Sequence, residues 1–230
     1  MAEPERLAGD QAFRTKQLLG CDREMTYGGA LSFLRRKYTR DLNGADHFIS
    51  YPLLVAHAEK YGPISLVHFD AHSDTWPDDG IRLDHGSMFL RAAREGIVDP
   101  ATSLRLGIRT DNPHDHGFTV RDAPWIHENG IAATIAEVYR VVGNRPTYVT
   151  FDIDCLDPAF APGTGTPVVG GLSSAQAVGI IRGLGDLDLI GMDVVEVAPA
   201  YDHSKITALA AATIAHDLLC LLAVKKRDAT

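Results

Sequence analysis

The 230-residue sequence predicts a single α/β domain built around a parallel sheet. The length suits one domain, since domains commonly hold about 100–200 residues. A hydrophobic fraction of 45% provides enough apolar side chains for a core. Short apolar runs alternate along the chain with runs of helical spacing, and this alternation is typical of a parallel sheet covered by helices on both faces.

Hydrophobic periodicity then places the elements in order. Residues 1–46 show little regular pattern and are expected to form an arm and a loop with some helix. Helices are expected at residues 47–59, 131–142, 173–184 and 206–224, the third of them capped by Ser173. Strands are expected at residues 64–69, 104–108, 147–151 and 187–195, the last of them broken by Gly191.

Composition excludes several classes of partner. A net charge of −8 weighs against nucleic acid. No run approaches the roughly 18 apolar residues of a membrane-spanning helix, and the polar N-terminus does not resemble a secretory signal. Cys21, Cys155 and Cys220 are too scattered for a disulfide framework or a zinc knuckle. These features predict a cytoplasmic protein with reduced thiols that binds neither nucleic acid nor membrane.

Polar side chains with a period of two follow the expected strand at residues 64–69. In the segment Asp70-Ala71-His72-Ser73-Asp74, extended backbone places positions 70, 72 and 74 on the same side. Ligands of parallel α/β sheets gather at the carboxyl ends of the strands, where this segment is expected to lie. The pattern predicts three metal ligands; the alternative is that the motif is a structural part of the loop.

A second pair of carboxylates, Asp152 and Asp154, follows the expected strand at residues 147–151. His47 is a further candidate ligand, although a lone histidine is more often a packed or surface residue. His68 lies one step deeper in its strand than Asp70 and is expected to pack rather than to bind. Four carboxylates buried together are very costly unless cations neutralise them, so the two motifs in one sheet support each other as a metal site.

The types of ligand indicate the metal. Carboxylates and imidazoles without a thiolate form an oxygen-rich set that favours Mn²⁺ over structural Zn²⁺. Six side chains exceed what one ion usually takes from a protein, so two ions are expected, with Asp70 and Asp152 as bridges. Four aspartates balance two divalent ions, and a hydroxide between the ions leaves the centre slightly negative. Such a centre favours a cationic substrate.

Three longer motifs resemble the signatures of the ureohydrolases, a family that includes arginase, agmatinase and guanidinobutyrase. They lie at residues 68–74, 151–158 and 192–199, and the resemblance runs from about Asp46 to Lys226. The stretches at residues 84–89, 159–167 and 200–202 are most similar to those of agmatinases. The resemblance implies a three-layer α/β sandwich of the arginase and deacetylase type, assembled as a homo-trimer or homo-hexamer.

The resemblance also implies a role for each site residue. Two Mn²⁺ ions per chain would activate water for attack on the guanidinium of agmatine, giving urea and putrescine. Asp74 would accept a proton and pass it to the leaving amine, Glu196 would pair with the guanidinium, and His85 would shuttle protons at the pocket mouth. The implied metal ligands are His47, Asp70, Asp74 and Asp152 for one ion, and Asp70, His72, Asp152 and Asp154 for the other.

The sequence departs from the family pattern before His47. Ureohydrolases begin with a strand and a Gly-x-Pro-x-Asp turn, which this sequence lacks; residues 42–47 read as though two distant pieces had been joined. We therefore expect residues 1–46 to be an arm without the first strand, and residues 47–230 to be the catalytic domain. A sheet edge exposed by that loss motivates a different function, that of an inactive family member that serves as a subunit.

Glu196, His85 and the substrate each admit a second interpretation. The alternative role for Glu196 is a structural ion pair. The alternative for His85 is a surface histidine without a role in the reaction. A guanidino acid, as in guanidinobutyrase, is the alternative substrate. The loop at residues 75–83 is expected to meet the far end of the substrate, and its acidic character, from Asp78, Asp79 and the adjoining Asp84, favours an amine.

Overall fold

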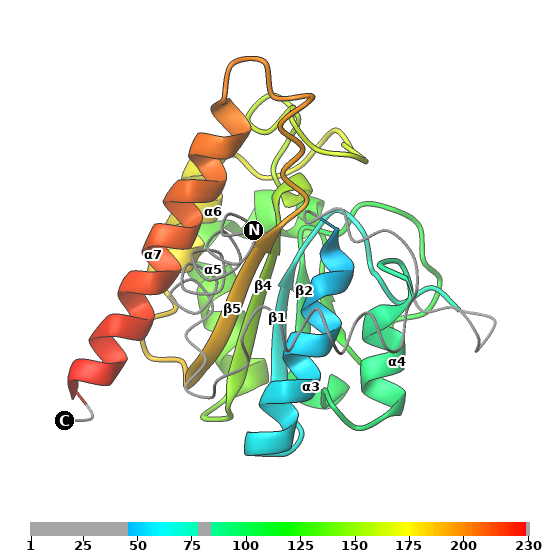
Figure 1. The fold of residues 1–230 in the computed structure, drawn as a ribbon, viewed down its shortest axis with the longest axis vertical. Coiled ribbons are helices and arrows are strands. Elements are labelled where there is room, and N and C mark those ends of the chain that lie inside the picture. Colours follow the sequence, from blue (N-terminus) through cyan, green and yellow to red (C-terminus); the bar gives the residue numbers. More distant parts are fainter. Residues whose placement is uncertain (1–45, 78–83, 229–230) are drawn as a thin grey trace, which may run out of the picture.

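The computed structural model describes residues 46–77 and 84–228. Within these residues a parallel sheet runs in the order β3-β2-β1-β4-β5 (Figure 1). Its parallel pairing confirms the α/β class that the alternating pattern predicts. The strands are β1 (Ser65–Phe69), β2 (Leu104–Leu106), β3 (Thr119–Arg121), β4 (Thr147–Asp152) and β5 (Leu189–Val195).

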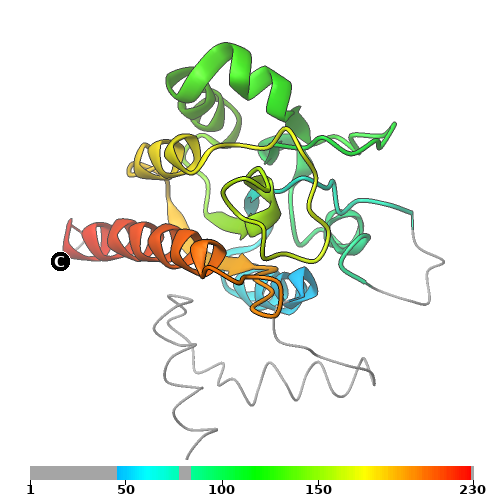
Figure 2. The same cartoon turned by 90° about the horizontal axis from the view of Figure 1, so that it is seen from above.

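Helices cover both faces of the sheet and complete the three layers (Figure 2). One layer holds α5 (Ala123–Val142), α6 (Ser174–Arg182) and α7 (Ile206–Asp228). The other layer holds α3 (Ser50–Tyr61) and α4 (Met88–Arg94). The 3₁₀ turns are η1 (His47–Ile49), η2 (Pro100–Thr102) and η3 (Ile153–Cys155).

Strand residues point alternately into two apolar cores. On β1, Leu66 packs in the core under α3 and α4, whereas Val67 and Phe69 pack in the core under the other three helices. On β4, Tyr148 and Val149 divide in the same way. Because both faces are covered, these strands appear in the sequence as nearly continuous apolar runs.

The four expected strands are confirmed, but the expected break at Gly191 is wrong. β5 continues through Gly191, which pairs with Tyr148 next to a register shift. A Cβ at this position would lie 2.5 Å from Nε2 of His57 and 2.7 Å from Cε2 of Tyr148. The glycine therefore allows α3 to pack closely on the sheet, and it does not end the strand.

Two elements lie outside the expected pattern. β3 has three residues and α4 has seven, so neither is long enough to show a clear period. The helix expected at residues 131–142 is the second part of α5, which already begins after Asp122, whose side chain accepts a hydrogen bond from the Trp125 amide. Gly130, with φ 79°, separates the two parts, so the earlier part does not continue the same face.

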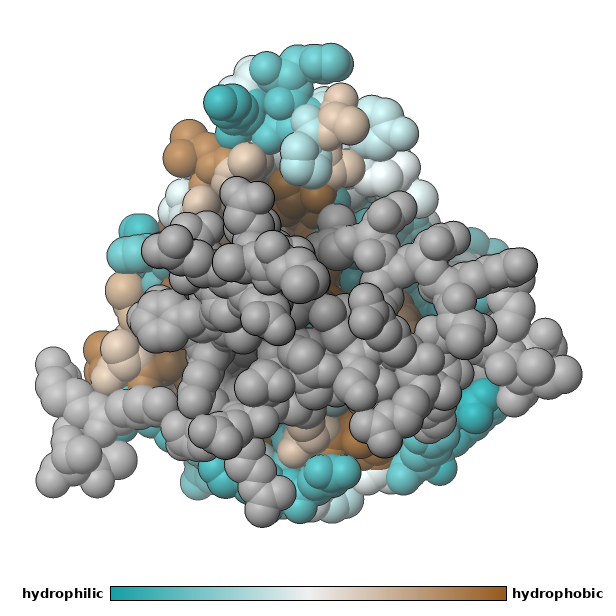
Figure 3. Space-filling model, in the orientation of Figure 1, coloured by the Kyte–Doolittle hydropathy of each residue, from teal (hydrophilic) through white to brown (hydrophobic). Residues whose placement is uncertain are grey.

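Part of the expected organisation falls outside the described residues. This applies to the arm at residues 1–46, apart from Asp46, and to Cys21, Asp78 and Asp79. Within the described residues, Ile206–Lys225 of α7 is long and apolar enough to cross a membrane. A helix that packs on a core passes the same test, and α7 packs against β5 and α6, so this is weak support for a membrane partner. In the space-filling view, apolar side chains of the described residues show along the left edge, where α7 lies (Figure 3).

The amino-terminal cap of α6 provides a test of the fold. Ser173 Oγ accepts a hydrogen bond from the Gln176 amide, and Gln176 Oε1 accepts one from the Ser173 amide, which confirms Ser173 as the capping residue. We expect Ser173→Ala to lower the free energy of unfolding by about 1 kcal/mol. Urea denaturation measures this loss. The neighbouring Ser174→Ala is the control, and an equal loss in both variants would contradict the assignment.

Candidate metal centre and substrate pocket

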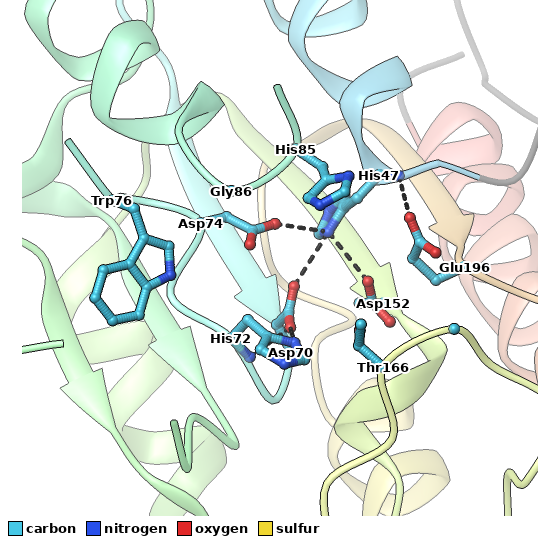
Figure 4. A pocket seen from close by; sticks show the side chains of 11 residues that line it. His47, Asp70, His72, Asp74, Trp76, His85, Gly86, Asp152, Thr166 and Glu196 are labelled. Atoms are coloured by element: carbon cyan, nitrogen blue, oxygen red, sulfur yellow. Dashed lines mark hydrogen bonds and ion pairs between the residues drawn. The ribbon is translucent and has the colours of Figure 1, made fainter. Parts of the chain in front are cut away.

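The six predicted metal ligands converge at the carboxyl edge of the sheet, and Figure 4 shows all of them except Asp154. His47 Nδ1 lies 3.1 Å from Asp70 Oδ2, 3.1 Å from Asp74 Oδ2 and 3.2 Å from Asp152 Oδ2. These four side chains come from three separate segments and are at most 5% exposed. They form the first cluster of the centre.

A second cluster shares Asp70 with the first. His72 Nδ1 lies 3.3 Å from Asp70 Oδ1 and 3.0 Å from Asp154 Oδ2. Asp70 therefore turns one oxygen toward each cluster, which is the geometry of a bridging carboxylate. The structure brings the six candidate ligands together in two adjoining clusters, with Asp152 in contact with His47 and Asp70 shared between the clusters.

Short-range turns set the spacing of these side chains. Asp70 Oδ1 accepts a hydrogen bond from the His72 amide at 2.6 Å, and Asp152 Oδ1 accepts one from the Asp154 amide at 2.8 Å. Each turn places the next candidate ligand directly beyond the end of its strand. Asp74 has φ 50°, a left-handed conformation that is costly for a non-glycine residue and that persists where surrounding contacts impose it.

The buried polar network around His47 fixes its ring. Thr150 Oγ1 lies 2.8 Å from His47 Nε2 and 2.5 Å from Asp193 Oδ1. Because the hydroxyl donates its one proton to the carboxylate, it accepts the proton of His47 Nε2. Nδ1 faces the three carboxylates, and no hydrogen bond of ordinary geometry satisfies it among the described residues. Burial lowers the pKa of His47, but its contacts with Asp152, Asp70 and Asp74 outweigh burial and raise that pKa well above its usual value, so this position favours a positive charge.

This orphaned nitrogen fits a metal ion. Adjacent ligands of an octahedral ion at about 2.1 Å are about 3.0 Å apart, close to the 3.1–3.2 Å measured around His47 Nδ1. Burial raises the pKa of Asp152 and Asp74, and the charge of Asp70 raises both further. Hydrogen bonds with Asp154 and Asp70 raise the pKa of His72 to about 10. The centre therefore attracts positive charge, and the donor set fits divalent cations.

A row of buried polar residues crosses the sheet beneath the centre. The row consists of four residues that pair in register across the strands, each at most 4% exposed: Asp193, Thr150, His68 and Arg105. His68 packs against Phe89, as expected, but its Nε2 also lies 2.8 Å from Asp70 Oδ2. The interpretation of His68 as a packing residue is therefore incomplete.

Sequence reasoning missed the roles of Asp193, Thr150 and Arg105. The signal was available, because each is a polar residue at an inward position of a strand expected to be buried. A polar side chain there must find partners, and these residues find them in the segments that carry the candidate ligands.

A cavity of about 350 Å³ opens above the two clusters. All the candidate ligands except Asp154 line its floor, and its walls include Trp76, His85, Gly165, Thr166 and Glu196 (Figure 4). Trp76 is 37% exposed and lies on the opposite side of the cavity from Glu196. The cavity thus joins a polar floor to an aromatic wall.

Glu196 lies beside the amino end of η1. Its Oε1 accepts a hydrogen bond from the His47 amide at 2.6 Å, and burial raises its pKa. No ion pair within the described residues involves Glu196, which argues against the structural ion pair considered from the sequence. The backbone of Glu196 is also left-handed, with φ 62°. Its second oxygen, Oε2, points toward Gly165 in the cavity wall, since a Cβ added to that glycine would lie 3.9 Å from Oε2.

His85 lies at the mouth of the cavity, where the sequence predicts it. Its side chain is 60% exposed, and its Nδ1 lies 3.3 Å from Asp46 Oδ1. The hydrogen bond with Asp46 raises the pKa of His85 to about 9. The imidazole therefore carries a proton at neutral pH and loses it as the pH rises through that value. Asp46, which caps η1, is a partner that sequence reasoning missed.

Comparison with known proteins decides the family. The model of the arginase family matches residues 37–220. The chain belongs to the arginase family. An agmatinase from Chromobacterium violaceum is 63% identical over 185 residues, which cover 80% of this chain and 58% of that relative.

Solved structures of the arginase family agree. A hypothetical agmatinase from Burkholderia thailandensis has a TM-score of 0.78 and 62% identity, covering 80% of this chain and 59% of that one. Proclavaminate amidino hydrolase from Streptomyces clavuligerus has a TM-score of 0.75 and 44% identity, covering 78% of this chain and 62% of that one. The chain spans about 60% of the length of the curated relatives it matches.

Thr150 provides a test of the network around His47. We expect Thr150→Val to weaken Mn²⁺ binding by about 10–100-fold, because the His47 ring loses the acceptor that fixes its tautomer. Calorimetric titration with Mn²⁺ measures the change. Thr147→Val on the same strand is the matched control, since Thr147 Oγ1 donates to the Arg145 carbonyl at the far end of β4. Unchanged affinity in Thr150→Val would contradict this role.

Proposed function

We propose that this chain is a dimanganese ureohydrolase that cleaves the guanidinium of agmatine to urea and putrescine. The observation that carries the proposal is the pair of clusters joined by Asp70 under a cavity that Glu196 and His85 border. The similarity to agmatinases at 58–63% identity supports the choice of substrate.

In this proposal two Mn²⁺ ions are held at the floor of the cavity. One is held by His47, Asp70, Asp74 and Asp152, and the other by Asp70, His72, Asp152 and Asp154. When bound, a pair of such ions supplies a strong nucleophile at neutral pH by lowering the pKa of a water between them. Cys155 is the one buried cysteine of the described residues; burial raises its pKa well above the ordinary value, so it is not a thiolate competitor for the metal.

Charge balance explains why a cation is the preferred substrate. The four aspartates carry four negative charges, which two divalent ions balance. A hydroxide between the ions would leave the floor of the cavity slightly negative. Glu196 adds a further carboxylate above it, and a guanidinium can pair with two oxygens in a planar arrangement. The cavity then orients the guanidinium carbon over the clusters.

Proton transfer falls to two residues in this proposal. Asp74 faces His47 at the floor and accepts a proton from the nucleophile, then donates it to the leaving amine as a general acid. His85, protonated at neutral pH and open to solvent, exchanges protons between the cavity mouth and water. The guanidinium is a poor electrophile, so both the attack and the departure of the amine need this help.

The far end of the cavity favours an amine over a carboxylate. The indole of Trp76 offers an aromatic face to a cation, and such contacts contribute roughly 0.5–2 kcal/mol. Asp84 adds negative charge nearby. A guanidino acid, as for a guanidinobutyrase, remains the alternative substrate.

Urea release from three substrates tests the proposed activity. With Mn²⁺ present we expect kcat/KM for agmatine to exceed that for 4-guanidinobutyrate and for arginine by at least about tenfold, equivalent to about 1.4 kcal/mol. Chelation of the metal should abolish release, and added Mn²⁺ should restore it. A preference for the guanidino acid would select the alternative substrate.

A second candidate function is an inactive subunit. It is the alternative that the sequence raises, because the Gly-x-Pro-x-Asp motif of the family is not found before His47. Chain that binds Mn²⁺ but releases no urea from any of the three substrates would select this candidate. We further propose that the protein is cytoplasmic and forms a homo-trimer or homo-hexamer. Sedimentation equilibrium measures the number of chains in the assembly.

Glu196 provides the sharpest test of substrate binding. We expect Glu196→Gln to lower kcat/KM for agmatine by about 100-fold, because the guanidinium loses its charged partner. Mn²⁺ affinity should stay within about twofold, since Glu196 lies outside the two clusters. The exposed Glu128→Gln is the matched control, and steady-state kinetics of the two variants gives the comparison. A loss of Mn²⁺ affinity equal to the loss of activity would assign Glu196 to the metal centre instead.

A further inference from the structure

Arg105 is a buried cation that contacts the segment carrying Asp74. It lies in the middle of β2 and is 2% exposed. Nη1 donates a hydrogen bond to Thr75 Oγ1 at 2.6 Å and another to the Ser73 carbonyl at 3.3 Å. Nη2 donates to the Asp115 carbonyl at 2.7 Å. The guanidinium therefore holds both neighbours of Asp74 in the chain.

No carboxylate of the described residues pairs with this guanidinium. None of the ion pairs in that part of the chain involves Arg105, and its Nε has no hydrogen-bond partner there. Burial lowers its pKa to about 10, and the ring of Phe118 lies 5.0 Å from Cζ. An unpaired buried charge is destabilising unless other interactions compensate it, so the guanidinium of Arg105 in the interior calls for an explanation.

The reason lies in the conformation of the segment at residues 73–75. Asp74 has a left-handed backbone, which surrounding contacts must impose. Asn112 Nδ2 adds hydrogen bonds to Ser73 Oγ at 2.7 Å and to Thr75 Oγ1 at 3.2 Å. β2 and the loop after it thus clamp the two residues that flank Asp74, although they contribute no side chain to the clusters.

We propose that Arg105 is a positioning residue, which fixes Ser73 and Thr75 so that the carboxylate of Asp74 points at His47. Arg105 pairs in register with His68 on the neighbouring strand β1, and His68 hydrogen-bonds Asp70. The two residues therefore hold the segment at residues 70–74 near its beginning and near its end. The charge of Arg105 also offsets part of the charge of the buried aspartates. This inference rests on the proposed metal-binding function.

Replacement of the guanidinium tests the role through metal affinity. We expect Arg105→Met to weaken Mn²⁺ binding at least tenfold and to lower kcat at saturating Mn²⁺ at least tenfold, while KM for agmatine stays within about twofold. Electron paramagnetic resonance of free Mn²⁺ measures binding without reference to activity. Arg105→Lys, which keeps the charge and one donor, should recover part of the affinity. Arg121→Met is the matched control, because Arg121 pairs with Glu137 away from residues 73–75.

Affinity and kcat in Arg105→Met equal to those of the parent chain would overturn the inference, and so would an equal loss in Arg121→Met. A parent chain that binds no Mn²⁺ would instead overturn the proposed function. If Arg105→Met does not fold, Thr75→Val replaces it, since this variant removes the acceptor at nearly constant volume. Weaker Mn²⁺ binding in Thr75→Val but not in Thr75→Ser would support the role, and equal binding in the two variants would overturn it.

Discussion

Repulsion among buried carboxylates is the constraint on which the rest of the structure depends. Asp70, Asp74, Asp152 and Asp154 are each at most 5% exposed, and their oxygens gather around two imidazole nitrogens at 3.0–3.3 Å. Even two protonated imidazoles balance only two of these four negative charges in a largely buried site. Divalent cations can balance all four, and the same arithmetic leaves a centre that accepts a cationic substrate. In the proposed function, the metal site and the substrate class are two consequences of one charge distribution.

The fold supplies the positions that this constraint requires. Parallel strands end at one edge of the sheet, so segments distant in sequence deliver their side chains to one place. Turns closed by the side chains of Asp70 and Asp152 set the distance to the next candidate ligand in the chain. Asp74 and Glu196 have a left-handed backbone, which marks the places where surrounding contacts impose the local conformation. Beneath them the row from Asp193 to Arg105 holds the ligand segments from the interior of the sheet. Hydrogen bonds from this row hold the strained edge in place.

The sequence predicts the parts of this arrangement that depend on short-range pattern. Strand ends with polar residues at a period of two identify the candidate ligands, because alternation along extended backbone is a local property. Capping of α6 by Ser173 is local in the same sense. Elements as short as β3 and α4 contain fewer than two full periods, too few for the pattern to stand out, so tertiary contacts decide them.

The partners of the ligands follow a different rule. Thr150 and Asp193 are 43 residues apart, and Arg105 reaches back 30 residues to Thr75, so only the register of the sheet brings them together. Gly191 shows the same limit, since its closeness to His57 depends on how α3 packs and not on the strand itself. The candidate ligands could therefore be named from the sequence, whereas the network that orients them is visible only in the three-dimensional structure.

Anomalous scattering from crystals soaked in Mn²⁺ tests the central claim most directly. The account predicts two peaks in the anomalous difference map. One should lie among His47, Asp70, Asp74 and Asp152, and the other among Asp70, His72, Asp152 and Asp154. A map without a peak at this edge of the sheet, with the six side chains still in place, would contradict it.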